Sequence, residues 1–96
     1  MDNYEVIKML VTNHDDKTII LKVLGLCDDP AIPVVTQHTL NKRIRIAANT
    51  LERILYFLSG IHMLNVEKVG RASIYSVSEA YGGRLLDELK GDKSND

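Results

Sequence analysis

The apolar residues in the first part of the chain recur at intervals of three and four, the spacing that places them on one face of an α-helix. One such stripe covers Asn3–Thr12. A second runs to about Cys27 from the acidic pair Asp15-Asp16, either of which can cap a helix. Pro30 ends this second helix, because proline has no amide hydrogen and restricts the residue before it. The pattern predicts two helices and then a loop over residues 28–35.

Two further helices are predicted in the middle of the chain. Thr36 is placed to cap the first, from Gln37 to about Ile44, with a hydrophobic staple between Val35 and Leu40. Val35, together with its neighbour Val34, also has the composition of a short edge strand. Residues 45–48 then interrupt the helical pattern.

The second of these helices has two possible starting points. Asn49 and Glu52 have the spacing of a capping box, which makes Asn49 the cap. The helix can equally begin near Ala47, because boundaries predicted from sequence are uncertain by a few residues. In both cases it ends at Ser59-Gly60, where glycine is a common C-terminal stop.

Alternation replaces the helical period in the last third of the chain. Residues 63–69 and 73–78 alternate apolar and polar positions around a turn at Gly70, which predicts a β-hairpin. Ser78 is placed to cap a last helix, from Glu79 to about Leu89, although Gly82-Gly83 weakens its start. The polar residues 91–96 are predicted to be a disordered tail.

The order of elements predicts a mainly α fold with a small β-hairpin wing, a winged helix-turn-helix. Ninety-six residues leave no room for a second hydrophobic core. The chain is therefore predicted to form a single domain over residues 1–90.

Composition changes the picture through charge. The net charge of −1 argues at first against a nucleic-acid binder. By segment, however, the charge is −3 over residues 1–30, +4 over residues 31–75 and −2 over residues 76–96. Six cations against two acids make up the central excess, and it coincides with the predicted helix-turn-helix and wing. These cations are Lys42, Arg43, Arg45, Arg53, Lys68 and Arg71.

Several function classes find no support in the sequence. The apolar runs are too short to span a bilayer, and the acidic N-terminus is unlike a signal peptide. A single cysteine fits a reducing, cytoplasmic location. That cysteine and the three histidines form no metal-ligand motif, and neither a catalytic pattern nor a phosphate loop is present. We expect no enzyme, no metal and no cofactor.

The stretch from Leu40 to Leu58, LNKRIRIAANTLERILYFL, resembles the helix-turn-helix of bacterial and archaeal transcription regulators of the ArsR-like and MarR-like families. The stretch Leu64 to Leu89 resembles their wing and closing helix, and Leu10 to Leu24 resembles their opening helix. The likeness covers about residues 5–90. The sequence departs from these families in having Ala47 where Ser or Thr is usual, and Tyr56-Phe57 where Lys or Arg is frequent.

The resemblance implies a sequence-specific regulator that binds double-stranded DNA. A recognition helix at about 47–60 would lie in the major groove, and a wing at about 64–78 would lie on the backbone or in the minor groove. Base edges would be contacted by the start of the helix and one residue a turn later, because Asn pairs with adenine, Arg with guanine and the Thr methyl with thymine. The base-facing residues are Ala48, Asn49, Thr50 and Arg53. The phosphate-facing residues are Lys42, Arg43 and Arg45, and the wing residues are Lys68 and Arg71.

Some apolar residues exceed what a three-helix core requires, and they predict a homodimer through the N- and C-terminal helices, as in the families named above. A monomer that fills its own core with them is the alternative. A winged-helix protein-interaction module within a transcription or replication assembly is the alternative function, because fold does not determine function. The residues in question are Tyr4, Val6, Met9, Val11, Tyr56 and Phe57.

Overall fold

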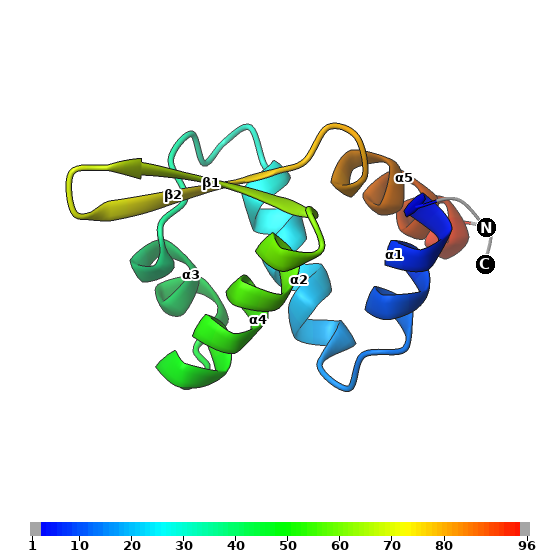
Figure 1. Cartoon of the computed structure of the whole chain (residues 1–96), viewed down its shortest axis with the longest axis horizontal. Helices are drawn as coiled ribbons and strands as arrows, with labels where there is room; N and C mark the ends of the chain where they lie inside the picture. Colours follow the sequence, from blue (N-terminus) through cyan, green and yellow to red (C-terminus); the bar gives the residue numbers. More distant parts are fainter. Residues whose placement is uncertain (1–2, 95–96) are drawn as a thin grey trace.

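The computed structural model describes residues 3–94. Within this range it contains five helices and a two-stranded antiparallel sheet, with extents of 38 × 28 × 25 Å (Figure 1). The elements in chain order are α1 (Asn3–Thr12), α2 (Lys17–Asp28), α3 (Gln37–Ile44), α4 (Ala48–Gly60), β1 (Leu64–Val69), β2 (Ala72–Val77) and α5 (Gly82–Ser94). The predicted fold class, mainly α with a β-hairpin wing, is confirmed.

Local sequence signals determine the bounds of the first three helices. Helix α1 has the predicted limits, and α2 begins one residue after Asp16. The Asp16 side chain makes no capping bond; instead the Asp16 amide donates to Nδ1 of His14 at 3.0 Å. Thr36 caps α3 as predicted, in a capping box that it shares with Thr39. The staple residues Val35 and Leu40 are both buried.

Helix α4 starts at Ala48, so the predicted start near Ala47 is confirmed and the alternative, in which Asn49 caps the helix, is wrong. The N-cap position is Ala47, and no side chain bonds the free amides of the first turn. The short turn after α3 explains the difference, since Ile46 packs against the core and fixes where the next helix begins. Tertiary packing thus outweighs the local preference of Asn49 and Glu52 for a capping box.

Helix α5 also begins later than the sequence indicates, at Gly82 instead of Glu79. The carbonyl of Ser78 accepts bonds from the amides of Gly82 and Gly83 at 2.9 and 3.1 Å, so the residues between form a turn. The helix runs to Ser94 and thus enters the segment 91–96, for which the sequence predicts a disordered tail. Residues 95 and 96 lie outside the described part of the chain.

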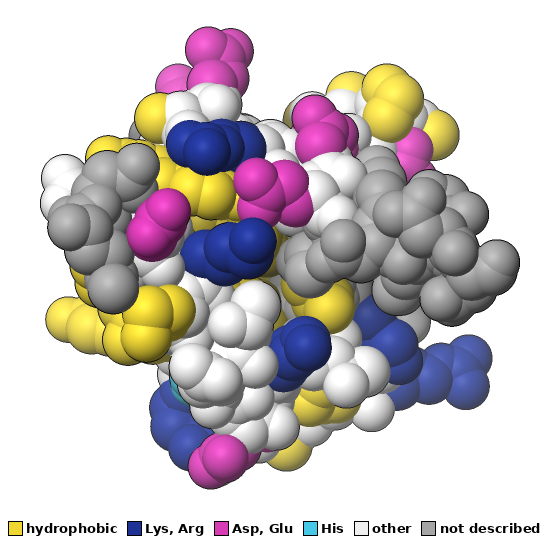
Figure 2. All heavy atoms as spheres, turned by 90° about the vertical axis from the view of Figure 1, so that its right-hand side faces the viewer, with side chains coloured by type: hydrophobic (Ala, Val, Ile, Leu, Met, Phe, Trp, Pro, Cys, Tyr) yellow, Lys and Arg dark blue, Asp and Glu magenta, His cyan; other side chains and the backbone are white. Residues whose placement is uncertain are grey.

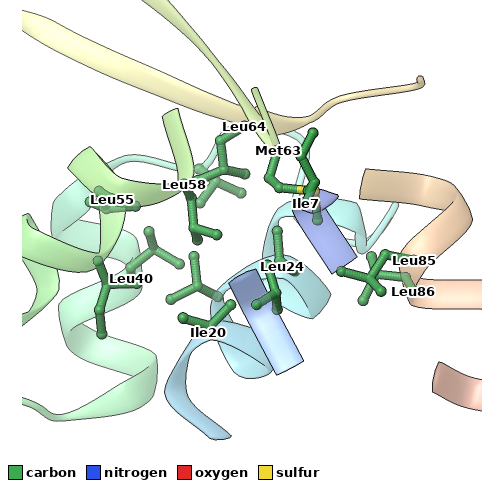
Figure 3. Close-up of a cluster of buried hydrophobic side chains, with 14 of the residues drawn as sticks. Ile7, Ile20, Leu24, Leu40, Leu55, Leu58, Met63, Leu64, Leu85 and Leu86 are labelled. Carbon is green, nitrogen blue, oxygen red and sulfur yellow. The ribbon is translucent and has the colours of Figure 1, made fainter. Parts of the chain in front are cut away.

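One continuous core joins all the helices and the base of the hairpin (Figure 3). Leucine and isoleucine side chains from α2, α3 and α4 meet in its centre, and they are covered by Met63, just before β1, and by Leu64, the first residue of β1. At the other end, Leu85 and Leu86 of α5 pack with α1. Burial of these side chains is the main force that fixes the helix-turn-helix relative to α1 and α5.

The hairpin is tied to the rest of the fold near its base. Leu64 pairs with Val77, and the Tyr75 amide donates to the Val35 carbonyl at 2.8 Å. The Val34-Val35 segment therefore touches the edge of β2 through one bond, although it forms no strand. Within residues 3–94, no helix combines the length and the apolar character that crossing a bilayer requires.

Candidate nucleic-acid interface

Helices α3 and α4 form a helix-turn-helix with a connection of three residues. Arg45 ends α3 in the left-handed region, with φ of 60°, and its amide donates to the Asn41 carbonyl at 3.0 Å. Gln37 at the start of α3 donates from Nε2 to Oε1 of Glu52 on α4, at 3.2 Å. These contacts hold the two helices in a fixed mutual position.

The outward face of α4 carries a stripe of polar side chains. Asn49, Arg53 and Tyr56 are spaced four and three residues apart, which places them on one side of a helix, and all three are exposed. Ala48 is exposed at the first position, whereas Thr50 is half-buried toward the flank. The sequence-predicted base-facing residues therefore lie together at the N-terminal half of α4.

Glu52 and Tyr56 belong to the same exposed surface, although neither was predicted as a site residue. In the sequence, Glu52 has the spacing of a capping-box residue, and Tyr56 belongs to an apolar pair. Their spacing from Asn49 and Arg53 is the signal that could have identified them. The two residues of the pair Tyr56-Phe57 have different surroundings. Tyr56 is 84% exposed, whereas the Phe57 ring lies 4.6 Å from the ring of His14, measured between centroids.

The wing presents its two faces to different surroundings. Val66 pairs with Tyr75 and Lys68 pairs with Ser73, so these side chains share the face that carries Leu64 into the core. Glu67 points to the opposite face. Its carboxylate is thereby separated from the ammonium group of Lys68, although the two residues are consecutive.

A groove lies between α4, the start of α3 and this face of the wing. It has a volume of about 490 Å³, and we call it the α4–wing groove. Its lining consists of Gln37, Glu52, Leu55, Tyr56, Ser59, Val66, Lys68 and Tyr75. Apolar ring and methyl groups thus lie beside an ammonium, a carboxylate, an amide and hydroxyl groups.

The remaining predicted cations are all exposed but do not form a single cluster. Arg71 follows Gly70 at the tip of the hairpin and lines a hollow with the N-terminal residues of α3. Arg43 faces the other way, toward Lys22 and Leu26 of α2. Lys42 and Arg45 lie at the C-terminal end of α3, next to the turn. Among the described side chains, those of residues 3–88, none of the six central cations forms an ion pair.

A second surface, on α1, is apolar. Tyr4 and Val11 are buried in the chain's own core, which corrects the expectation that they are surplus to it. Val6, Met9 and Leu10 face outward, with Met9 50% exposed. These three line an open hollow of about 490 Å³ whose other walls include Asn13, His14 and Phe57. We call this surface the α1 patch.

Charged side chains join α1 to α5. The Tyr4 hydroxyl donates to Glu88 Oε2 at 2.6 Å, and Lys8 Nζ lies 3.0 Å from the same oxygen. Arg84 lies over the Tyr4 ring, with 3.8 Å from guanidinium carbon to ring centroid. Figure 2 shows the face formed by these two helices, where basic and acidic side chains alternate along the middle and hydrophobic ones gather at an edge.

The cysteine and histidines form no cluster for a metal. No three metal-ligating side chains meet in the described residues. Burial raises the pKa of the Cys27 thiol to about 12, so this group stays protonated at neutral pH.

No protein-family model matches the sequence, and neither does the sequence of any curated protein. Solved structures do match the fold. TubR from Bacillus thuringiensis serovar israelensis, bound to 24 bp of tubC, has a TM-score of 0.72 at 14% identity, with 96% of each chain covered. HlyU from Vibrio cholerae has a TM-score of 0.69 at 17% identity, with 90% of this chain and 87% of that chain covered.

ZitR from Lactococcus lactis, as a mutant with one cysteine replaced by serine, has a TM-score of 0.66 at 14% identity. The match covers 81% of this chain but 53% of ZitR, so the chain spans about half of that protein. At these identities the likeness establishes the fold alone. The chain has the winged helix-turn-helix fold that these structures share.

Proposed function

We propose that this protein is a sequence-specific, double-stranded DNA-binding transcription regulator that acts as a homodimer. In this proposal α4 lies in the major groove and the β1–β2 wing contacts the backbone or the minor groove. The observation that carries the proposal is the exposed stripe on α4, which combines an amide and a guanidinium next to a wing that carries Lys68 and Arg71. The structure of TubR on a DNA duplex, with the same fold, adds support.

The chemistry of the α4 stripe suits base edges in a major groove. The Asn49 amide can bond adenine in a bidentate manner, and the Arg53 guanidinium can bond guanine in the same way. Ala48 and the Thr50 methyl group offer apolar contact to a thymine methyl. Glu52 has one oxygen engaged by Gln37, and its other oxygen is suited to accept a bond from a cytosine amino group.

The unpaired central cations suit phosphates. A phosphate contact requires a cation that is exposed and unpaired, and Lys42, Arg45, Lys68 and Arg71 meet this condition within the described residues. Arg43 lies toward α2, so its contact requires the DNA to reach around α3. Because the whole chain carries only −1, we expect weak non-specific affinity and a larger share of binding from base contacts.

The homodimer proposal is supported by the α1 patch. Val6, Met9 and Leu10 are exposed together on α1, around the hollow that Phe57 also lines. Helices α1 and α5 lie together, away from the wing (Figure 1). A two-fold pairing through these helices would present two copies of α4 to successive turns of the major groove. The acidic ends of the chain would then lie on the side of the dimer away from the DNA.

Binding to duplex DNA at several salt concentrations tests the proposal. Fluorescence anisotropy with a labelled duplex should give an affinity that falls steeply between about 50 and 200 mM salt, because phosphate contacts release counterions. Arg53→Ala should weaken binding, whereas Lys17→Ala, which removes an exposed cation from α2, should not. A complete lack of duplex binding at the lowest salt concentration would exclude the proposal.

One observation favours the alternative function, a protein-interaction module: the 84% exposed Tyr56. Large aromatic side chains are enriched where proteins bind each other. That alternative predicts a stable protein partner in a pull-down, with Arg53→Ala retaining the partner. Arg53→Ala, compared with the control Lys17→Ala, therefore distinguishes the two functions.

A further inference from the structure

Tyr56 occupies a special place on the exposed face of α4. It lies one turn beyond Arg53, at the edge of the α4–wing groove, and 84% of the residue is open to solvent. Across the groove, Val66 and Lys68 project from the facing side of β1. An aromatic ring, an aliphatic side chain and an ammonium group thus border the α4–wing groove.

The position of the α4–wing groove determines which part of the DNA passes through it when α4 lies in a major groove. The wing extends from the C-terminal end of α4 and diverges from it (Figure 1). In such a complex its tip would reach toward the neighbouring minor groove. A major and a minor groove are separated by one sugar–phosphate strand. That strand has to cross the space between α4 and the wing, which is the α4–wing groove.

We propose that the α4–wing groove seats one sugar–phosphate strand of the duplex and that Tyr56 is its principal neutral contact. The Tyr56 ring packs against a deoxyribose together with Val66, and its hydroxyl donates to a phosphate oxygen. Lys68 neutralises the same stretch of backbone. This inference rests on the proposed function and adds a residue that the charge pattern did not identify.

The charges around Tyr56 favour a DNA strand over a protein partner in this groove. Arg53 lies one turn before Tyr56 on α4 and Lys68 lines the groove with it, and neither has an ion-pair partner among the side chains that the structure describes, those of residues 3–88. Glu52 is the one acid in the lining, and the Gln37 amide already occupies one of its oxygens. A phenol suits the boundary between an apolar sugar and a charged phosphate, because one end of it is apolar and the other is polar.

Tyr56→Phe tests the role of the hydroxyl without removing the ring. Loss of a bond to a charged acceptor should weaken duplex binding about tenfold at every salt concentration. The salt slope should stay unchanged, because a neutral hydroxyl releases no counterion. Lys68→Gln should instead reduce the slope by about 0.9, the value for one phosphate contact. Tyr81→Phe, a tyrosine outside the groove, is the matched control and should bind like the wild type.

The base preference separates a backbone contact from a base contact. Tyr56→Phe should weaken binding to all duplexes by a similar factor, because a phosphate carries no sequence information. A changed base preference, or unaltered affinity in Tyr56→Phe while the wild type binds DNA, would overturn the inference and leave the proposed function intact. If the wild type binds no duplex at all, the proposed function and this inference both fail. Because Tyr56 is exposed, we do not expect Tyr56→Phe to weaken binding through misfolding, and an unchanged melting curve would verify this.

Discussion

The hydroxyl of Tyr4 donates to Oε2 of Glu88 across 2.6 Å, which joins the first helix of the chain to the last. This bond, with Lys8 and Arg84 beside it, lowers the pKa of the Glu88 carboxyl from its ordinary value of 4.5. The hydrogen bond from Tyr4 is the largest cause, the bond from Lys8 is the next, and partial desolvation acts in the opposite direction. Helices α1 and α5 are thus held together by a charged contact in addition to the apolar core.

The lowered pKa of Glu88 predicts a pH-dependent contribution to stability. A carboxyl with a lower pKa in the folded state stabilises the fold above its unfolded pKa, near 4.5, and this contribution is lost as the pH falls through the folded value. Glu88→Gln should therefore be less stable than the wild type near neutral pH, and the difference should shrink in acid. Urea denaturation near neutral pH and in acid measures this difference in stability, with Glu67→Gln on the exposed wing as the control. An equal difference at both pH values would contradict the role of the carboxylate.

Two adjacent glycines should respond oppositely to alanine. A Cβ at Gly82 would overlap the Val77 side chain and lie 3.0 Å from the Met63 carbonyl oxygen, whereas one at Gly83 would meet open space. We expect Gly82→Ala to destabilise the fold by about 1–3 kcal/mol through overpacking. Gly83→Ala should instead stabilise α5 by roughly 0.4–1 kcal/mol, because it restricts the unfolded chain. Chemical denaturation of both variants checks this, and equal effects would refute the close packing at Gly82.

Cys27 should react slowly in the folded protein. Burial raises the pKa of its thiol to about 12, and the thiolate is the form that reacts with alkylating agents. Iodoacetamide near neutral pH should therefore modify Cys27 far more slowly in the native protein than in denaturant. Mass spectrometry of timed samples measures both rates. Similar rates would show that the thiol is accessible in the folded state.

The proposed dimer can be disrupted on the α1 patch without affecting the core. Met9→Lys places a charge among Val6 and Leu10, so it should shift the protein toward a monomer. Val34→Lys makes the same kind of change on an equally exposed loop residue, 52% open, and should leave the dimer intact. Sedimentation velocity distinguishes the two. A wild type that sediments as a monomer at all concentrations would refute the homodimer.

The sequence predicted those parts of the fold that depend on local signals. The limits of α1, the Thr36 cap of α3 and the hairpin all follow from periodicity and short-range bonding. It failed, or left two starts open, where the packing of the folded chain decides. The start of α4 follows the packing of Ile46, and the start of α5 follows the approach of Gly82 to Val77. The partner of Tyr4 is 84 positions away, which no local pattern can reveal.

The candidate site was predicted only in part. Helical spacing correctly groups Asn49 and Arg53 on one exposed face, since that face depends on period alone. The sequence did not indicate that Arg43 turns toward α2, nor that Tyr56 and Phe57 point to different surroundings. Such orientations depend on how the helices pack together, and a charge count along the chain contains no information about them.

The most direct test of the central claim is the base preference of α4. Duplexes with a randomised segment are selected for binding to the wild type, to Arg53→Ala and to Lys17→Ala, and the bound pools are sequenced. The account predicts an enriched sequence for the wild type and for Lys17→Ala, with a guanine preference that disappears in Arg53→Ala. An absence of enrichment in the wild type, or the same base preference in all three proteins, would contradict a recognition role for α4.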